Sequence, residues 1–492
     1  MSFSKYLSLV ILFSLLFITV PAYKKQIFYT RFVDEDYNFT IGKYLTRGEV
    51  LYDDIITNHL PITHLVSGLL QARDKPDTVA ALIEEHRIAI INWSAIWSII
   101  IVLYFGIPGL IFALIYELTK NHLYGNLFLA ETFVAYPLAF LIGLALFKKF
   151  PLKTSEMFLV GVLLTVCTLT LGPIWPGILF LCLVLLVKQF KNLKTPRLKV
   201  MSIIFFTLGS LSTFIVVLPY INVAGFFEYY ILGNFSTMVP HSSTYWQNSL
   251  PQSFITPFIS LMIKGSDDHL MLIRILSILL ILDLAYVFFL KKFSRGLIIF
   301  ILLGLFNIRF INPGEGHFNG FHLLPWYTAL VTITSFLFIE QFKNRSFYLI
   351  KFLNIGLLIV ALFLSFRYAQ QNLFVEKDSK KEYEVLFSTH TKIGESIKNI
   401  KHPADTLFVN SDAWLVYWQS DTNHLPKLFG YYTWMSGIPK LHEKMHQAFR
   451  QTPPVYLYCE GCKNSEFGQY LGKYSEVKGY EEKQNLFNYT QF

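Results

Sequence analysis

Three consecutive acidic residues, Asp34, Glu35 and Asp36, follow the first apolar segment of the chain and are followed at once by Tyr37. Charged side chains this close to an apolar segment cost free energy unless water solvates them or a ligand uses them. A carboxylate held there can accept the proton of an attacking hydroxyl group. The plainer interpretation is an acidic helix start, because carboxylates favour the positive N-terminal end of a helix.

The residues after this acidic cluster argue for more than a solvated loop. Gly48 and Tyr52 precede Asp53 and Asp54, and Asn58-His59-Leu60-Pro61 then leads into a new apolar run. Tyr52 and His59 are therefore candidate substrate-binding residues, although His59 is also a plausible helix-entry residue ahead of a proline.

The composition indicates a membrane protein. The chain has 492 residues, of which 53% are hydrophobic and 15% charged, and its mean hydropathy is +0.44. Soluble domains carry about 25% charged residues, so lipid must act as solvent for most of this chain. The formal net charge is +9. In a membrane protein the positions of Lys and Arg orient the spans, so no nucleic-acid partner is expected.

Apolar runs predict about eleven membrane-spanning helices, since one crossing takes about 20 apolar residues. The first run lacks a small-x-small cleavage site and is interpreted as an uncleaved helix. Residues 122–147 are divided into two short spans, and a single span over this range is the alternative. The predicted spans are 6–22, 88–118, 122–131, 132–147, 155–170, 172–187, 199–221, 269–290, 296–312, 321–340 and 346–367.

Lysine and arginine gather in four basic joints, at 148–153, 188–199, 291–295 and 343–345. Two predicted spans separate each joint from the next, so all four fit on the cytoplasmic side. A cytoplasmic N-terminus requires 122–147 to cross twice. The segments then left outside are 23–87, 222–268, 309–325 and 368–492.

The last of these segments is polar enough for a small extracytoplasmic α/β domain. Strands are predicted at 405–410 and 454–459, and helices at 380–400 and 437–450. The predicted fold class is thus an α-helical polytopic membrane protein. Residues 1–367 form its transmembrane domain, with the acidic motif in loop 23–87, and residues 368–492 form the second domain.

A second polar loop, from Arg309 to Pro325, is a candidate phosphate-binding segment. Arg309, His317 and His322 are its candidate ligands, because cationic side chains pair well with phosphate. A plain polar turn is the alternative.

Other ionisable residues near the apolar runs have simpler interpretations. Asp283 lies within a span, and a polar contact between helices is expected for it. Glu117 and Lys120 are interpreted as an ordinary surface pair at the cytoplasmic edge. Arg31 is expected to mark the end of a span at the membrane interface.

The loop motifs resemble the first external loop of the GT-C glycosyltransferase superfamily, in which an acidic pair and a tyrosine precede Gly-x-x-x-Tyr-x-Asp and His-x-Pro. They are most like the dolichyl-phosphate-mannose protein mannosyltransferase-like branch, which includes bacterial lipid A aminoarabinose transferases. The resemblance implies transfer of a hexose or pentose from a polyprenyl-phosphate donor to a hydroxyl of a glycan, lipid or protein.

In this resemblance Asp34 matches the catalytic aspartate, and Glu35 completes the acidic pair. Asp36 is an additional acid that is taken as a substrate contact, with a base or a metal ligand as its alternatives. No cofactor is expected, and a divalent metal remains the alternative.

A polytopic transporter or lipid flippase is the competing function, and a non-catalytic scaffold is a third. Transporters favour ionisable residues at mid-membrane depth, whereas here the acids cluster beside a span. The expected location is a plasma membrane, and high use of Lys, Asn, Ile and Phe is typical of a bacterial protein.

Overall fold

The sequence folds into two units in this computed structural model, which describes residues 3–232, 250–307, 320–342, 348–410, 412–425, 439–459, 466–476 and 486–489. Unit 1 comprises Met1–Gln26, Arg87–Val216 and Trp246–Glu376. Unit 2 comprises Ile27–His86, Val217–Tyr245 and Lys377–Phe492. The loop with the acidic motif therefore packs with the C-terminal region. A domain boundary at residue 367 stays a prediction.

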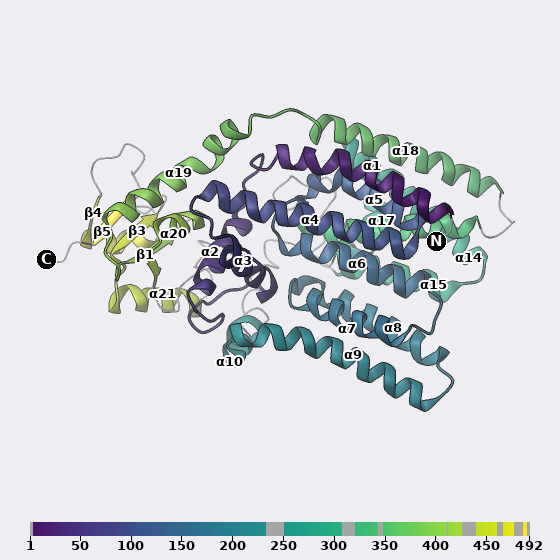
Figure 1. Ribbon diagram of the computed structural model, residues 1–492, viewed down its shortest axis with the longest axis horizontal. Coiled ribbons are helices and arrows are strands. Elements are labelled where there is room, and N and C mark those ends of the chain that lie inside the picture. The colour runs from purple at the N-terminus through teal and green to yellow at the C-terminus, as the bar shows by residue number, and fades with distance from the viewer. Residues whose placement is uncertain are drawn as a thin grey trace. The chain divides into compact units, whose positions relative to one another are not determined.

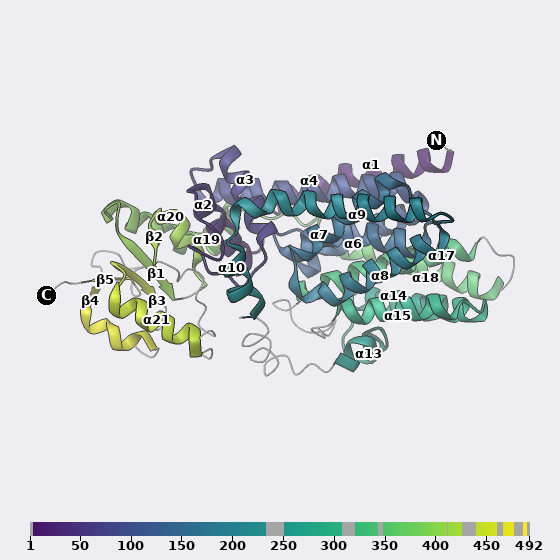
Figure 2. The same ribbon diagram turned by 90° about the horizontal axis from the view of Figure 1, so that it is seen from below.

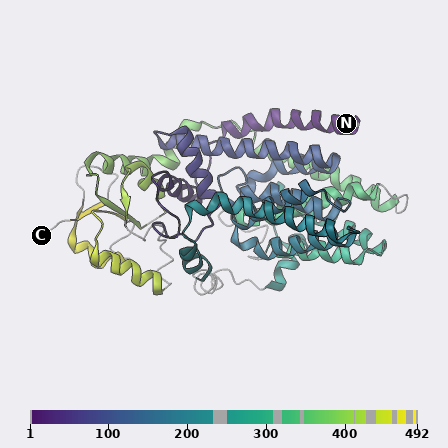
Figure 3. The ribbon, with the colours of Figure 1, turned by 60° about the horizontal axis from the view of Figure 1, so that its bottom comes forward.

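Unit 1 is built from apolar helices that run alongside one another (Figure 1, Figure 3). Two segments form its centre, namely α6 and the continuous segment of η6 and α17. In each of them, 89% of the residues in the most apolar stretch are buried. The elements are α1 (Phe3–Lys25), α4 (Val79–Phe105, whose first turns belong to unit 2), α5 (Ile107–Thr119), η1 (Lys120–Leu123), α6 (Ala130–Phe147), α7 (Thr154–Thr168), η2 (Gly172–Ile174), α8 (Trp175–Asn192), α9 (Pro196–Val217), α12 (Leu250–Phe254), α13 (Thr256–Met262), α14 (Asp268–Phe289), α15 (Phe293–Phe306), η6 (Phe321–Leu323), α17 (Leu324–Gln341) and α18 (Tyr348–Asn372).

Within the described residues, eight helices are long and apolar enough to cross a membrane, and three shorter apolar helices accompany them. The predicted class, a multi-pass helical membrane protein with a small C-terminal sheet region, is confirmed. The count of eleven is not matched exactly, since α7 and α15 are shorter than a full crossing and the region 88–147 is divided differently.

The predicted division of 88–147 is wrong. The run 88–118 is two antiparallel helices, because Ser98 on α4 donates a hydrogen bond of 2.8 Å to Glu117 on α5. Gly106, with φ of 72°, allows the reversal because glycine adopts positive φ without strain. Conversely, 122–131 is no span, since α6 begins only at Ala130. Four α-helices of unit 1, namely α1, α4, α5 and α6, still precede the first basic joint.

The first three basic joints lie at one end of unit 1, as predicted. Lys148 lies 4.3 Å from the ring centre of Tyr104, whose neighbour Leu103 accepts a hydrogen bond from Lys5. The second and third joints reach the same helix end, through Lys188 at the carbonyl of Ala145 and Arg295 over Phe147. The N-terminus and the first three joints therefore share one end. The fourth joint lies outside the described residues, and the cytoplasmic assignment stays a prediction.

The opposite end of unit 1 holds a buried charge pair. Lys120 Nζ lies 2.6 Å from Glu117 Oε2, and both residues are at most 2% exposed. Tyr136 donates to Glu117, and Tyr23 at the end of α1 donates to its carbonyl. The prediction of a surface pair at the cytoplasmic edge is thus wrong, because the α4–α5 reversal returns Glu117 to the end where α1 finishes.

Asp283 makes the predicted polar contact between helices. It accepts hydrogen bonds from Gln341 at the end of α17 and from Asn354 on α18. Asn354 also donates to Gln341 at 2.9 Å. The three side chains therefore join α14, α17 and α18.

Unit 2 combines short helices with a mixed sheet. Its strands have the order β2-β1-β3-β5-β4, with β1 parallel to β2 and β3, and β5 antiparallel to β3 and β4. α19 and α20 lie on one side of the sheet and α21 on the other (Figure 2). Both predicted strands and both predicted C-terminal helices are confirmed. The elements are α2 (Val33–Thr46), α3 (Pro61–Asp74), η3 (Leu218–Tyr220), α10 (Val223–Gly225), η4 (Phe226–Leu232), α19 (Ser379–Ile400), β1 (Thr406–Asn410), α20 (Trp414–Ser420), β2 (Asn423–His424), α21 (Pro439–Gln451), β3 (Tyr456–Cys459), η9 (Glu466–Lys473), β4 (Tyr474–Glu476) and β5 (Leu486–Tyr489).

Candidate active site

The acidic cluster forms the first turn of α2, where the helix dipole favours negative charge. Glu35 and Asp36 are fully buried, whereas Asp34 is only half-buried. Of the three carboxylates, Asp34 is therefore the one that solvent reaches.

Asp36 is held by an ion pair. Its Oδ2 lies 2.7 Å from Arg31 Nε, and a second guanidinium nitrogen donates to the carbonyl of Asp412 at 2.7 Å. The interpretation of Arg31 as an interface marker is therefore incomplete, because its side chain ties the start of α2 to the segment that leads into α20.

Further hydrogen bonds fix α2 against the C-terminal part of unit 2. Thr40 donates to the carbonyl of Trp414 at 3.0 Å, and Tyr44 donates to the carbonyl of Thr422 at 3.0 Å. The position of the acidic turn thus depends on residues nearly four hundred positions further along the chain.

Aromatic rings converge one turn after Asp34. The ring of Tyr37 meets His59 at 5.1 Å, His64 at 5.8 Å and Trp414 at 5.0 Å between centres. His59 and His64 stack at 6.0 Å with an angle of 12° between their planes. The structure therefore brings the predicted residue His59 to the helix that carries Asp34.

His64 is a residue that the sequence analysis missed. It is fully buried, and neither ring nitrogen has a hydrogen-bond partner within the described part of the chain. Burial, with a smaller effect of His59, lowers the pKa of His64 well below its ordinary value, so the ring is neutral at pH 7. Its signal in the sequence is its place in the first turn of the helix that starts at Pro61.

Tyr52 is a buried residue that holds the backbone of His59 in place through a hydrogen bond. It is 1% exposed, and its hydroxyl donates to the carbonyl of His59 at 2.7 Å. Its ring packs against Phe226 and Tyr230. Burial raises the pKa of the Tyr52 phenol well above its ordinary value, which keeps the hydroxyl protonated as a donor. Direct contact of Tyr52 with a substrate stays a prediction.

His322 belongs to unit 1 and pairs with a residue that the sequence analysis took for part of a span. His322 Nδ1 lies 3.1 Å from Glu131 Oε1. Glu131 is in the first turn of α6 and 4% exposed. Its signal in the sequence is a single acid at the start of a long apolar run. Arg309 and His317 lie outside the described residues.

Metal binding was the alternative for Asp36. No group of three or more His, Cys, Asp and Glu residues in the described ranges could hold a metal ion. The expectation of a cofactor-free protein stays a prediction.

No protein-family model and no curated protein matches the sequence. Among solved structures, the crystal structure of ArnT from Cupriavidus metallidurans bound to undecaprenyl phosphate is similar, with a TM-score of 0.53 and 10% identity over 97% of each chain. At this identity the likeness concerns the fold, and it extends over both units. The predicted architecture is thereby confirmed at the level of the fold, which this chain shares with ArnT.

Proposed function

We propose that this protein is a membrane glycosyltransferase that moves a sugar from a polyprenyl-phosphate donor to an acceptor hydroxyl at the external membrane face. The observation that carries the proposal is the half-buried Asp34 at the start of α2. It lies in a fold shared over 97% of the chain with a protein bound to undecaprenyl phosphate. The acceptor is a glycan, a lipid or a protein.

In this reaction the acceptor oxygen attacks the anomeric carbon of the donor sugar. The bond from that carbon to the phosphate oxygen breaks, and its electron pair leaves with the polyprenyl phosphate. Asp34 takes the acceptor proton as the new bond forms, a step that contributes about 10²–10⁴-fold in rate. Because Asp36 is already paired with Arg31, Asp34 is the better general base, with Glu35 next to it.

The leaving phosphate needs hydrogen-bond donors and positive charge. His322, held by Glu131 at 3.1 Å, is assigned to this role together with Arg309 and His317. His59, which is supported by Tyr52, is assigned to the sugar or the phosphate on the side of Asp34. No metal ion is required by these assignments.

The test is to incubate the purified full-length protein with a panel of polyprenyl-phosphate sugars and candidate acceptors, and to follow the donors by mass spectrometry. We expect one donor to be consumed, with release of polyprenyl phosphate. A transporter or flippase would instead move labelled lipid across sealed vesicles without changing its covalent structure, and this result would overturn the proposal.

A further inference from the structure

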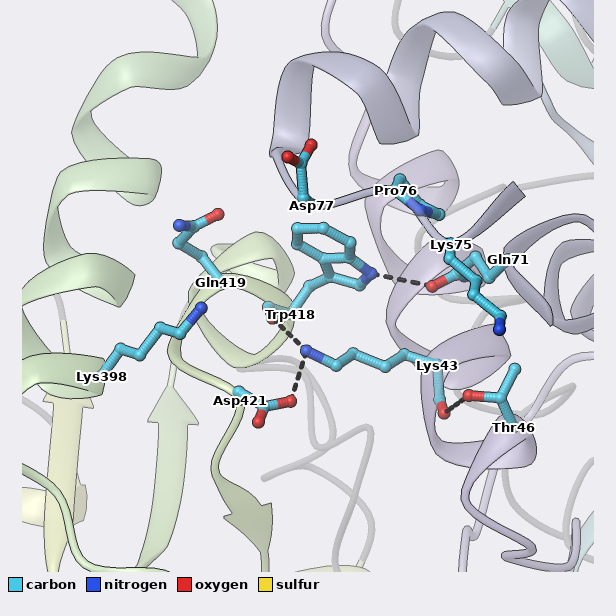
Figure 4. A pocket seen from close by; sticks show the side chains of 10 residues that line it. All are labelled: Lys43, Thr46, Gln71, Lys75, Pro76, Asp77, Lys398, Trp418, Gln419 and Asp421. Atoms are coloured by element: carbon cyan, nitrogen blue, oxygen red, sulfur yellow. Dashed lines mark hydrogen bonds and ion pairs between the residues drawn. The ribbon is translucent and has the colours of Figure 1, made fainter. Parts of the chain in front are cut away.

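A cavity of about 320 Å³, partly open to solvent, lies in unit 2 between the C-terminal ends of α2 and α3 and the pair α19–α20 (Figure 4). Ligand pockets occupy about 300–1,000 Å³, so this one has room for a single sugar-sized group. The side chains that matter for its chemistry are Lys43, Lys75, Lys398, Trp418, Gln419 and Asp421.

This cavity is separate from Asp34. Lys43 follows Asp34 by nine residues on the same helix. At 1.5 Å and 100° per residue, Lys43 lies about 13 Å further along α2 and on its opposite side. A ligand in the cavity would therefore not contact Asp34, although an oligosaccharide could reach both places.

Two carboxylates line the cavity, the exposed Asp77 and Asp421, whose side chain is 45% exposed. Asp421 is already neutralised. Asp421 pairs with Lys43 at 2.7 Å, with Arg47, and with Lys401 at 3.9 Å. Burial alone would raise the pKa of Asp421, but these cations more than offset it and lower that pKa. Because Asp421 is shared among three cations, it does not compensate the other lysines of the wall.

Positive charge therefore converges on the cavity. Figure 4 shows the side chains of Lys43 and Lys398 pointing toward one another from α2 and α19. Lys75 and Lys398 are exposed, and their amines have no ion-pair partner in the part of the chain that the structure describes. Asp77 offsets one of these two positive charges. Burial lowers the pKa of Lys43 to about 8, and Lys398 contributes to the shift while Asp421 opposes it. An anion between these amines would relieve their mutual repulsion.

Gln419 supplies a second sign of a ligand. The residue is 8% exposed, and its Oε1 has no hydrogen-bond partner among the described residues. Buried amide oxygens are almost always satisfied, so a hydroxyl donor from a ligand is the natural partner. Trp418 closes the wall, with its indole nitrogen bonded to Gln71 at 2.8 Å.

We propose that the cavity binds one negatively charged sugar, a saccharide unit that carries a phosphate or a carboxylate, as a subsite for the acceptor. The anion lies between Lys43 and Lys398, Lys75 lines the opposite part of the cavity, and sugar hydroxyls donate to Gln419. The acceptor role rests on the proposed transferase function, whereas the binding itself does not.

Binding is tested on the full-length protein in nanodiscs by isothermal titration at constant ionic strength. The probes are glucose 6-phosphate, glucuronate, glucose and inorganic phosphate. The variant combines Lys75→Gln with Lys398→Gln, and its control combines Lys380→Gln with Lys381→Gln, which removes two exposed lysines at the far end of α19. Melting temperatures establish that both variants fold.

We expect glucose 6-phosphate or glucuronate to bind the wild type and the control alike, and to bind the cavity variant more weakly by at least about tenfold, since each charge-assisted contact is worth about this much. Affinity should also fall as the pH rises above 8, because Lys43 then loses its proton. Equal binding to the cavity variant, or equal binding of glucose or of phosphate alone, would overturn the proposal of an anionic saccharide.

The acceptor role has its own measurement. In a working transferase assay, the cavity variant should raise the KM for a charged acceptor while kcat and the donor KM stay unchanged. An unchanged acceptor KM would refute the acceptor subsite and leave the transferase intact. Saccharide binding without any transfer would refute the transferase and its acceptor, but not the sugar site.

Discussion

Arg31 and Asp36 form an ion pair across the first turn of α2, with 2.7 Å between Arg31 Nε and Asp36 Oδ2. The Asp36 side chain is fully buried, while that of Arg31 is 22% exposed. One of three adjacent acids is thereby committed to holding the turn in place. The half-buried Asp34 is left as the acid that faces substrate in the proposed reaction.

Arg31→Ala should destabilise unit 2. It leaves the Asp36 carboxylate buried without its cation, and breaking such a pair costs about 3–5 kcal/mol. Thermal unfolding in detergent should show a clear drop in melting temperature, and adding Asp36→Asn should restore part of it. A melting temperature equal to that of the wild type would show that the pair contributes no stability.

Asp34→Asn should abolish most transfer without affecting the fold. The amide cannot accept the acceptor proton, so kcat should fall by about 10²–10⁴-fold. Glu384→Gln is the matched control, because it removes an exposed carboxylate on α19. Full activity in Asp34→Asn, with an unchanged melting temperature, would rule out this residue as the general base.

His322→Ala should weaken the use of the donor if this residue contacts the leaving phosphate. Loss of one hydrogen bond to a charged group costs about 1.5–3 kcal/mol, so kcat/KM for the donor should fall by about ten- to a hundredfold. His402→Ala removes an exposed histidine of unit 2 and should have no effect. Unaltered donor kinetics in His322→Ala would remove this residue and Glu131 from the site.

Lys43 should make stability rise with pH in the alkaline range. Burial lowers its pKa to about 8 in the folded protein, while an unfolded lysine has a pKa of about 10.4. Between these values the unfolded chain binds more protons, so raising the pH favours the folded state. Relative to Lys43→Met, the wild type should gain about 2 kcal/mol from pH 8 to pH 10. A constant difference in melting temperature over this range would contradict the lowered pKa.

A cysteine introduced in unit 2 and a cysteine introduced in the first basic joint should react with a maleimide from opposite sides of the membrane. Lys380 is exposed on α19 in unit 2, and Lys149 is exposed in the first basic joint. With an impermeant maleimide on intact cells, we expect Lys380→Cys to be labelled above the wild-type background and Lys149→Cys only after lysis. The reverse pattern would place Asp34 and the proposed reaction in the cytoplasm.

Local composition and spacing were enough to predict the class of this protein and several of its parts. The apolar runs indicated a helical membrane protein, and the basic joints indicated which helix ends lie together, because charge and hydropathy act on each segment separately. The strand at 405–410 and the helix at 380–400 were likewise visible from patterns within a few residues of sequence. The motif loop around Asp34 was identified before any contact of its residues was known.

Only the tertiary structure decided which distant residues meet. A continuous apolar run does not reveal the reversal at Gly106, so the buried pair of Glu117 and Lys120 was assigned to the wrong end. The contacts of Arg31 with Asp412 and of Glu131 with His322, and the packing of α2 against α20, depend on how the helices pack. Packing depends on the fit between side chains that lie hundreds of residues apart in the sequence. The hydrophobic pattern within one segment therefore does not identify the segment that packs against it.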